Sequence, residues 1–222
     1  MSVEGGGAKD GSRDSSAGFA GAIEGGRSGR GAQPPSGEIK EIRTPLDDAD
    51  VASLRAGDRV RISGVIYTAR DAAHGRLAPL VEKGQPLPID VKGQIIYYTG
   101  PSPARPGGVI GSVGPTTASR MDKFTPALLA LGLKGTIGKG YRGQAVKDAL
   151  KQHKGVYFGS IGGAGAVLSE FVKKAEVVAY EDLGTEAIRR LDVAGFPAIV
   201  LYDCHGGDLY QEGQKIYARE NA

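Results

Sequence analysis

Beyond about residue 39, apolar residues alternate with polar ones or recur at helical spacing along most of the chain. The first clear alternation is Arg59–Tyr67 (RVRISGVIY), in which charged or small residues separate Val, Ile, Val and Tyr, and it predicts a β-strand. Asp71–Lys83 follows with Ala, Leu and Val at helical spacing and predicts a helix. This segment therefore predicts a strand followed directly by a helix.

The same kinds of pattern continue toward the C-terminus. They predict strands at Gln94–Tyr98, Gly108–Val113, Leu133–Ile137, Val156–Phe158, Val177–Tyr180 and Ala198–Tyr202, and helices at Asp122–Leu131, Gln144–His153 and Gly163–Lys173. Strands and helices alternate with short loops, an order typical of the α/β class. Because the first half is richer in strands than a simple doubly wound sheet requires, we expect a mixed sheet.

Residues 1–38 differ from the rest of the chain in composition. They contain 11 glycines and 6 serines, and their only aromatic residue is Phe19. Such a segment cannot bury enough apolar surface to offset the entropy lost on ordering. We therefore predict a disordered extension over residues 1–38 and one domain over residues 39–222. A docking tail that orders on a partner is the alternative.

Composition excludes several classes of protein. The chain has one cysteine, so it can form no internal disulfide and cannot build an iron–sulfur site from its own thiolates alone. No stretch approaches the roughly 18 apolar residues of a membrane span, and the N-terminus lacks the apolar core of a secretory signal, so a cytoplasmic location is expected. The net charge of +3 comes from well-mixed charges, which gives little reason to expect a nucleic-acid partner.

Glycine is abundant, at 36 of 222 residues, but the standard phosphate-binding motifs are not met. A P-loop requires Gly, four further residues and then Gly-Lys-Ser/Thr. Around Gly138-Lys139 the first glycine position holds Leu133 and the hydroxyl position holds Gly140. A nucleoside triphosphate site is therefore not expected.

A second glycine-rich stretch, residues 159–165 (GSIGGAG), follows a predicted strand and opens a predicted helix. The dinucleotide spacing G-x-G-x-x-G is not met, because Gly163-x-Gly165 is followed by Leu168. Close packing of the helix on the strand explains these glycines best. Binding of a carboxylate by the exposed amides is the alternative.

Polar residues interrupt the apolar pattern where strands end. Arg70 and Asp71 lie at a strand-to-helix junction, where Asp71 is expected to cap the helix. Thr116 and Arg120 follow a rigid Gly-Pro turn, and Lys139 lies between two glycines. Three cations at separate loop ends, with hydroxyls between them, suit a small substrate that carries two carboxylates.

Each of these residues also has a purely structural interpretation. Arg70 would pair with a carboxylate of the protein, Thr116 would cap a helix, and Lys139 would be solvated. Of the three histidines only His74 lies beside this set, and no nucleophile–base pair can be identified. Catalysis would therefore need another chain or a metal held elsewhere.

The same segments resemble a known family over about residues 40–219. The stretches that carry the likeness are SGVIYTARDAAH (residues 63–74), GSVGPTTASRMD (111–122), GTIGKG (135–140), YFGSIGGAGAVL (157–168), KKAEVVAYEDLGTEAIRRL (173–191) and DCHGGDLY (203–210). Together they resemble the β subunit of class I fumarate hydratase and of L(+)-tartrate dehydratase, which are iron–sulfur hydro-lyases. The family's more usual GPTTSxRM is GPTTASRM here.

This resemblance implies a swivelling β/β/α domain that closes over a [4Fe-4S] cluster held by three cysteines of a separate α subunit. Cys204 would then be a strand-end residue and not a cluster ligand. By the same likeness Arg70, Arg120 and Lys139 would bind the carboxylates of a small dicarboxylate. Thr116 would be the base at the carbon that gains or loses a proton. His74 would either line the site or lie behind it.

The activity expected from the resemblance is reversible hydration of fumarate to L-malate by a heteromer of this chain and its α partner. Dehydration of L(+)-tartrate to oxaloacetate is the alternative reaction, since the same cations would serve it. A subunit that binds a dicarboxylate without catalysis is the remaining hypothesis. No membrane partner is expected.

Overall fold

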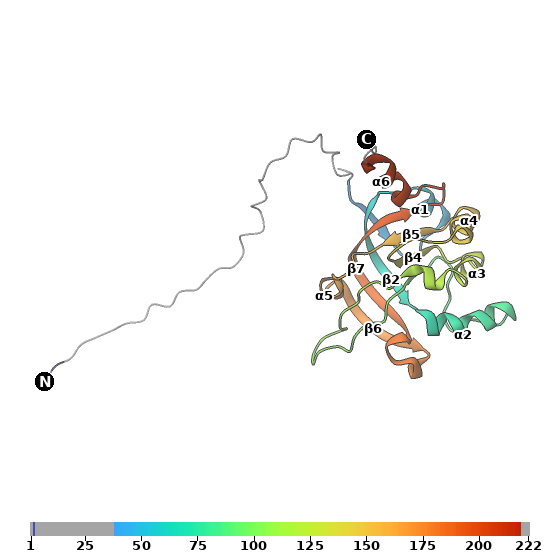
Figure 1. Cartoon of the computed structure of the whole chain (residues 1–222). Helices are drawn as coiled ribbons and strands as arrows, with labels where there is room; N and C mark the ends of the chain where they lie inside the picture. The colour runs from blue at the N-terminus through green and yellow to red at the C-terminus, as the bar shows by residue number, and fades with distance from the viewer. Residues whose placement is uncertain (1, 3–37, 219–222) are drawn as a thin grey trace. The chain divides into compact units, whose positions relative to one another are not determined.

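The computed structural model describes residue 2 and residues 38–218 (Figure 1). The extension predicted over residues 1–38 therefore lies almost wholly outside the described residues. Within them the chain forms a seven-stranded mixed sheet in the order β1-β2-β3-β4-β5-β7-β6. The α/β class and the mixed sheet are confirmed.

The strands and helices follow one another in the order expected for α/β proteins. The strands are β1 (Lys40–Arg43), β2 (Arg59–Thr68), β3 (Ile95–Tyr97), β4 (Gly135–Gly138), β5 (Val156–Gly159), β6 (Val172–Ala179) and β7 (Ile188–Tyr202). The α-helices are α1 (Asp48–Ala52), α2 (Asp71–Glu82), α3 (Thr125–Ala130), α4 (Gln144–Gln152), α5 (Gly165–Ser169) and α6 (Leu209–Tyr217), with short 3₁₀ helices η1 (Ala118–Met121) and η2 (Glu181–Glu186).

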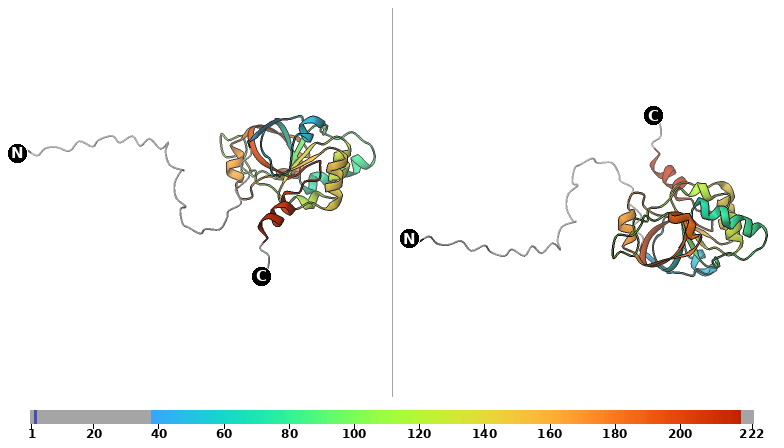
Figure 2. Two further views of the ribbon diagram at one scale, coloured as in Figure 1. Left: turned by 90° about the horizontal axis from the view of Figure 1, so that it is seen from above. Right: turned by 90° about the horizontal axis from the view of Figure 1, so that it is seen from below.

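Strands β2 and β7 close part of the sheet into a ring. Neighbouring strands from β1 to β5 run parallel, whereas β7 runs antiparallel to β2, β5 and β6. The pairings β2–β3–β4–β5–β7 return to β2 through a long ladder that joins Arg59–Thr68 to Arg189–Ile199. The two curved strands are seen around this ring in Figure 2.

Successive side chains along the strands pack alternately into two separate hydrophobic cores, because neighbouring residues of a strand point to opposite faces of the sheet. Ile95, Tyr97 and Phe158 point to one face and pack with residues of the long strands inside the ring. Ile96 and Tyr98 point to the other face and pack under helices α2, α3 and α4. Figure 1 shows these three helices on one side of the strands. The strands are thus packed against apolar side chains on both faces of the sheet.

Several predicted elements are confirmed, with small shifts in their ends. The predictions for β2, α2, β3, α4 and β5 each agree with the structure to within two residues at either end. The helix predicted over Asp122–Leu131 is split into η1 and the shorter α3, and the strand predicted over Leu133–Ile137 lies two residues further on at its start. Elements β1, α1 and α6 are short, and the sequence pattern did not predict them.

Other predictions are wrong for identifiable reasons. Residues 108–113 form no strand, because Ser102 binds the backbone of Gly111 and Ser112 and folds the segment into a loop. The helix predicted over Gly163–Lys173 ends at Ser169, because the following residues pair with β7 as part of β6. β7 begins ten residues before the predicted Ala198, since pairing with β2 overrides its irregular pattern.

The most buried charge in the described domain is the guanidinium of Arg142, whose side chain is 0% exposed. It donates to Asp122 Oδ1 at 2.6 Å from Nε, to Thr125 Oγ1 at 2.7 Å and to Thr136 Oγ1 at 3.2 Å. Its carbon Cζ also lies 4.9 Å from the centre of the Tyr157 ring. One side chain therefore ties β4, β5, α3 and the η1–α3 turn together.

We predict that Arg142→Met lowers the free energy of unfolding by about 3 kcal/mol, because it removes one partner of a buried, hydrogen-bonded ion pair. Urea unfolding followed by circular dichroism measures this change. Arg61→Met is the matched control, since Arg61 and its partner Glu41 are 54% and 65% exposed and such pairs contribute little. Equal stability of the Arg142 variant and the control would contradict the assignment.

Candidate active site

The carboxyl ends of β2, β3 and β4 lie at one edge of the sheet, because these strands are parallel neighbours. Arg70 follows β2 and Lys139 follows β4. The loop that carries Thr116 is fastened between β3 and β4: the Thr116 N–H donates to Tyr98 O at 2.7 Å, and the Lys139 N–H donates to Thr116 O at 3.2 Å. The structure therefore places Thr116 and Lys139 side by side.

Close approach of this loop to β4 depends on Gly138. A Cβ at Gly138 would lie 3.0 Å from Ala118 Cβ and 3.1 Å from Tyr98 Cδ2, closer than ordinary contacts. Gly140, just beyond Lys139, has a φ of +82°, a conformation that side chains of L-residues rarely adopt. The glycines on either side of Lys139 are therefore required by the path of the chain.

Arg70 and Arg120 are joined through one carboxylate. Asp71 accepts from Arg120 Nε at 2.8 Å through Oδ1 and from Arg120 Nη2 at 2.5 Å through Oδ2. The same Oδ2 lies 3.7 Å from Arg70 Nη2. Arg120 belongs to η1, whose first N–H, that of Ala118, donates to the Lys139 carbonyl at 2.9 Å. The side chains of Arg70 and Arg120 thus meet at Asp71, and backbone hydrogen bonds join Thr116 and Lys139 to the start of η1, which carries Arg120.

Arg70 has a second carboxylate neighbour and one unsatisfied donor. Glu186 Oε1 lies 3.4 Å from Arg70 Nη2, and Gly100 packs so closely that a Cβ there would be 2.9 Å from Arg70 Nη1. The Nε of Arg70 is buried and has no hydrogen-bond partner among residues 38–218. A buried donor without a partner costs free energy, and an anion reaching it would remove that cost.

The structure agrees with some of the purely structural interpretations of these residues and not with others. Arg70 does pair with carboxylates of the protein, as that interpretation expected. Thr116 caps no helix, since the cap position of η1 is Thr117 and its side chain makes no capping bond. Lys139 is exposed, and its ammonium makes no ion pair within the part of the chain that the structure describes.

The expected cap on α2 is wrong. Asp71 is the first residue of α2, Arg70 holds the cap position, and neither side chain caps the helix. Instead Glu186 Oε2 accepts from the Ala72 N–H at 3.0 Å. The Asp71 carboxylate is occupied by Arg120, so the cap is supplied from a segment far away in the sequence.

His74 lies behind Arg70, fully buried in the helical core. Its Nδ1 contacts the Arg70 carbonyl oxygen at 2.8 Å, and its ring stacks on Phe124 with centroids 5.7 Å apart. Burial lowers the pKa of His74 to about 4, so the imidazole is neutral near pH 7. With a neutral ring, Nδ1 donates to the Arg70 carbonyl oxygen and so helps to hold the backbone of Arg70 in place.

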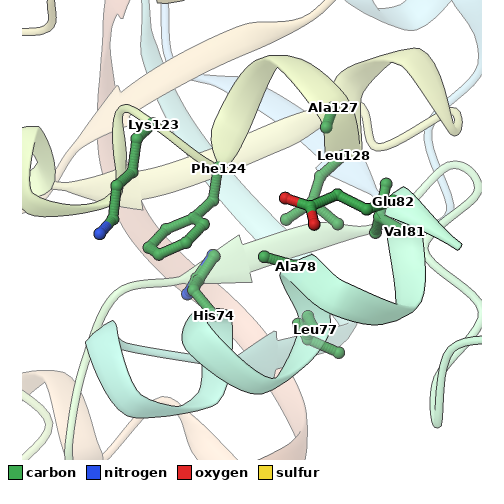
Figure 3. Close-up of a pocket in the computed structure, with 9 residues that line it drawn as sticks. All are labelled: His74, Leu77, Ala78, Val81, Glu82, Lys123, Phe124, Ala127 and Leu128. Carbon is green, nitrogen blue, oxygen red and sulfur yellow. The ribbon is translucent and has the colours of Figure 1, made fainter.

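Two pockets of the described domain lie beside this network. One of about 310 Å³ lies between α2 and α3, with His74, Phe124 and Leu128 in its walls, and contains none of the four predicted site residues (Figure 3). Another of about 440 Å³ includes Lys139, Ser160 and Tyr210. Neither of these two pockets includes Arg70, Thr116 or Arg120.

Cys204 lies apart from the predicted site residues. Its Sγ is 3.9 Å from the Val51 carbonyl oxygen and 3.4 Å from His205 Nε2, and burial raises the pKa of the thiol above its ordinary value. Between residues 38 and 218 no group of three His, Cys, Asp or Glu side chains is placed to hold a metal ion. The residues described here do not fit an iron–sulfur cluster.

The sequence of the chain matches a known protein family. Residues 32–213 match the family described as "Fumarase C-terminus". The chain belongs to the fumarase C-terminus family. This membership agrees with the likeness in the ARDAAH, GPTTASRMD and GKG segments.

No helix of the described domain has the length and apolar character needed to cross a membrane.

Relatives of two kinds share this family. The chain is 42% identical to "Fumarate hydratase class I, aerobic" of Escherichia coli (strain K12) over 178 residues, which is 79% of this chain and 32% of that protein. It is 37% identical to "Fumarate hydratase 2" of Leishmania major over 176 residues, 78% of this chain and 31% of that protein. The chain spans about a third of the length of these fumarate hydratases.

A third relative is close to this chain in length. The "Putative L(+)-tartrate dehydratase subunit beta" of Methanocaldococcus jannaschii is 34% identical over 183 residues, which is 79% of this chain and 94% of that protein. The family thus includes the same domain within longer proteins and as a protein named as a subunit.

Sequence reasoning missed Glu186 and gave Asp71 the wrong partner. Asp71 stands in the ARDAAH segment, so the motif itself was a signal for its place in the network. Glu186 stands in the 173–191 stretch of the family likeness, but nothing there pointed to α2, because the β2–β7 pairing brings it to Ala72, 114 residues away.

We predict that the free energy of unfolding falls as the pH is lowered from about 6.5 to 4, in part because of His74. The unfolded histidine takes up a proton near pH 6.5, whereas the folded one resists until about pH 4, so acid favours the unfolded chain by up to about 3 kcal/mol. Urea unfolding at pH 7 and pH 4.5 measures the loss. His74→Gln should reduce it, and an unchanged loss would contradict the assignment. His153→Gln is the control.

Proposed function

We propose that this chain is the β-type part of a class I fumarate hydratase, which catalyses the reversible hydration of fumarate to L-malate. One observation carries the proposal: Asp71 joins Arg70 and Arg120, and backbone bonds join Thr116 and Lys139 to the helix of Arg120, in a domain 42% identical to a class I fumarate hydratase. Three cations suit a substrate with two negative charges.

The proposal gives each of these residues a role. Arg70 binds one substrate carboxylate with its unsatisfied Nε, and the remaining carboxylate lies between Arg120 and Lys139. Such a clamp fixes the substrate so that a proton is exchanged at one chosen carbon. Thr116 is the group that exchanges this proton. Its backbone is held from both sides, the residue is partly exposed, and its hydroxyl makes no hydrogen bond within residues 38–218.

An α part that holds a [4Fe-4S] cluster completes the active site in this proposal. One cysteine cannot supply three thiolates, so the cluster ligands come from outside this domain. When bound, the cluster supplies a Lewis acid for the substrate hydroxyl and carboxylate. The exposure of Arg120 and Lys139 supports a site completed by a second surface. In this proposal the domain is the swivelling β/β/α part of the enzyme. The enzyme is proposed to be cytoplasmic.

Dehydration of L(+)-tartrate to oxaloacetate is the second candidate. It is favoured by the relative of similar length that is named as a tartrate dehydratase subunit. The same cations would hold tartrate, because its two carboxylates are spaced like those of malate. Binding of a dicarboxylate without catalysis is less well supported, since Thr116 and the cations are all present.

We predict that this chain, copurified anaerobically with its α part, hydrates fumarate faster than it dehydrates L-tartrate. Arg120→Ala should lower kcat/KM about 100-fold, the effect of losing a charge-assisted carboxylate contact. Ultraviolet absorbance at 240 nm follows fumarate, and a coupled assay follows oxaloacetate.

Arg76→Ala is the control for the Arg120 variant. Arg76 lies on α2 and is paired with Asp182, away from the strand-end network. Turnover of L-tartrate alone would replace fumarate hydration with the second candidate. Normal kcat/KM in Arg120→Ala would show that the clamp is assigned to the wrong residues, and turnover by the isolated chain would refute the need for an α part.

A further inference from the structure

Two carboxylates lie among the cations that the proposed function assigns to the substrate. Asp71 is bound to Arg120 and close to Arg70, and Glu186 is paired with Arg70. A negative charge beside an anion-binding arginine opposes binding of a dianion. The carboxylates therefore weaken affinity, and their presence needs another reason.

Stability does not supply that reason for Asp71. The side chains of Arg120 and Asp71 are 48% and 33% exposed, and exposed ion pairs contribute little to folding. What the pair does fix is geometry. Asp71 takes the Nε and Nη2 edge of the Arg120 guanidinium with both of its oxygens, so only the Nη1 end stays open to a ligand.

Glu186 fixes Arg70 in a similar way. Its Oε2 accepts from the Ala72 N–H at 3.0 Å, and its Oε1 lies 3.4 Å from Arg70 Nη2. One carboxylate thus ties the first turn of α2 to the side chain of the residue before it. Arg70 Nη1 packs against Gly100, and the buried Nε has no hydrogen-bond partner among residues 38–218.

We propose that Asp71 and Glu186 are positioning residues, which occupy one part of each arginine and leave a defined donor on each for the substrate. Asp71 Oδ2 lies near Nη2 of both arginines, so it also fixes their separation. A dicarboxylate of fixed length needs two anchors at a fixed distance. This inference rests on the proposed function, because it assigns these arginines to a dicarboxylate.

The test compares kcat with KM in the complete enzyme, with its α part. Asp71→Asn should lower kcat at least tenfold, since a misplaced substrate loses the alignment needed for proton exchange. Its KM for fumarate should stay equal or fall, because a negative charge has been removed. Glu186→Gln should behave in the same way.

Asp182→Asn is the matched control. Asp182 is bound to Arg76, and this pair also joins α2 to η2, but it lies outside the network of substrate-binding arginines. Its kcat and KM should equal those of the unaltered enzyme. A double variant adds the decisive comparison: because Asp71 makes both of its hydrogen bonds to Arg120, Asp71→Asn should lower kcat/KM by a much smaller factor when Arg120→Ala is already present.

The outcomes separate the inference from the proposed function. A raised KM with unchanged kcat, or an additive loss in the double variant, would overturn the positioning role while fumarate hydration stands. Should Asp71→Asn fail to fold or to copurify, Glu186→Gln decides by the same criterion. An unaltered enzyme that turns over neither fumarate nor L-tartrate would overturn the proposed function, and the inference with it.

Discussion

The antiparallel ladder between β2 and β7 is the constraint on which the candidate site depends. Its last pair joins Thr68 to Arg189, and the Arg189 N–H also donates to Thr68 Oγ1 at 3.0 Å. This register places the residues just before β7 against those just after β2. Glu186 therefore meets Arg70 and the start of α2, although nothing in the local sequence links them. A shift of one residue would turn each side chain to the other face.

The parallel strands provide the other half of the arrangement. Because β2, β3 and β4 end at one edge, the segments after them converge, and backbone bonds hold the Thr116 loop between the last two. Asp122, which follows η1, accepts from the buried Arg142 and from the Gly143 N–H and so joins η1 to the chain beyond Lys139. The cations are thus mounted on rigid backbone, as an anion clamp requires.

Local pattern predicted β2, β3 and β4, but neither the loop that carries Thr116 nor the contacts within the site. The alternation in Arg59–Tyr67 predicts β2, whereas the strand predicted before Thr116 is absent, and backbone bonds with Tyr98 and Lys139 hold that loop instead. Asp71 was expected to cap α2 because a cap is the local role of an aspartate at a helix start. The structure gives that role to Glu186, since a long-range strand pairing decides which carboxylate is near. The early half of β7 was missed for the same reason.

The central claim is that the cations at these strand ends bind a dicarboxylate between this domain and an α part. A crystal structure of the complete enzyme with L-malate bound tests it most directly. The account predicts one malate carboxylate on Arg70 Nε, the other between Arg120 and Lys139, and the proton-exchanging carbon next to Thr116. Malate bound at a place that none of these four residues contacts would contradict it.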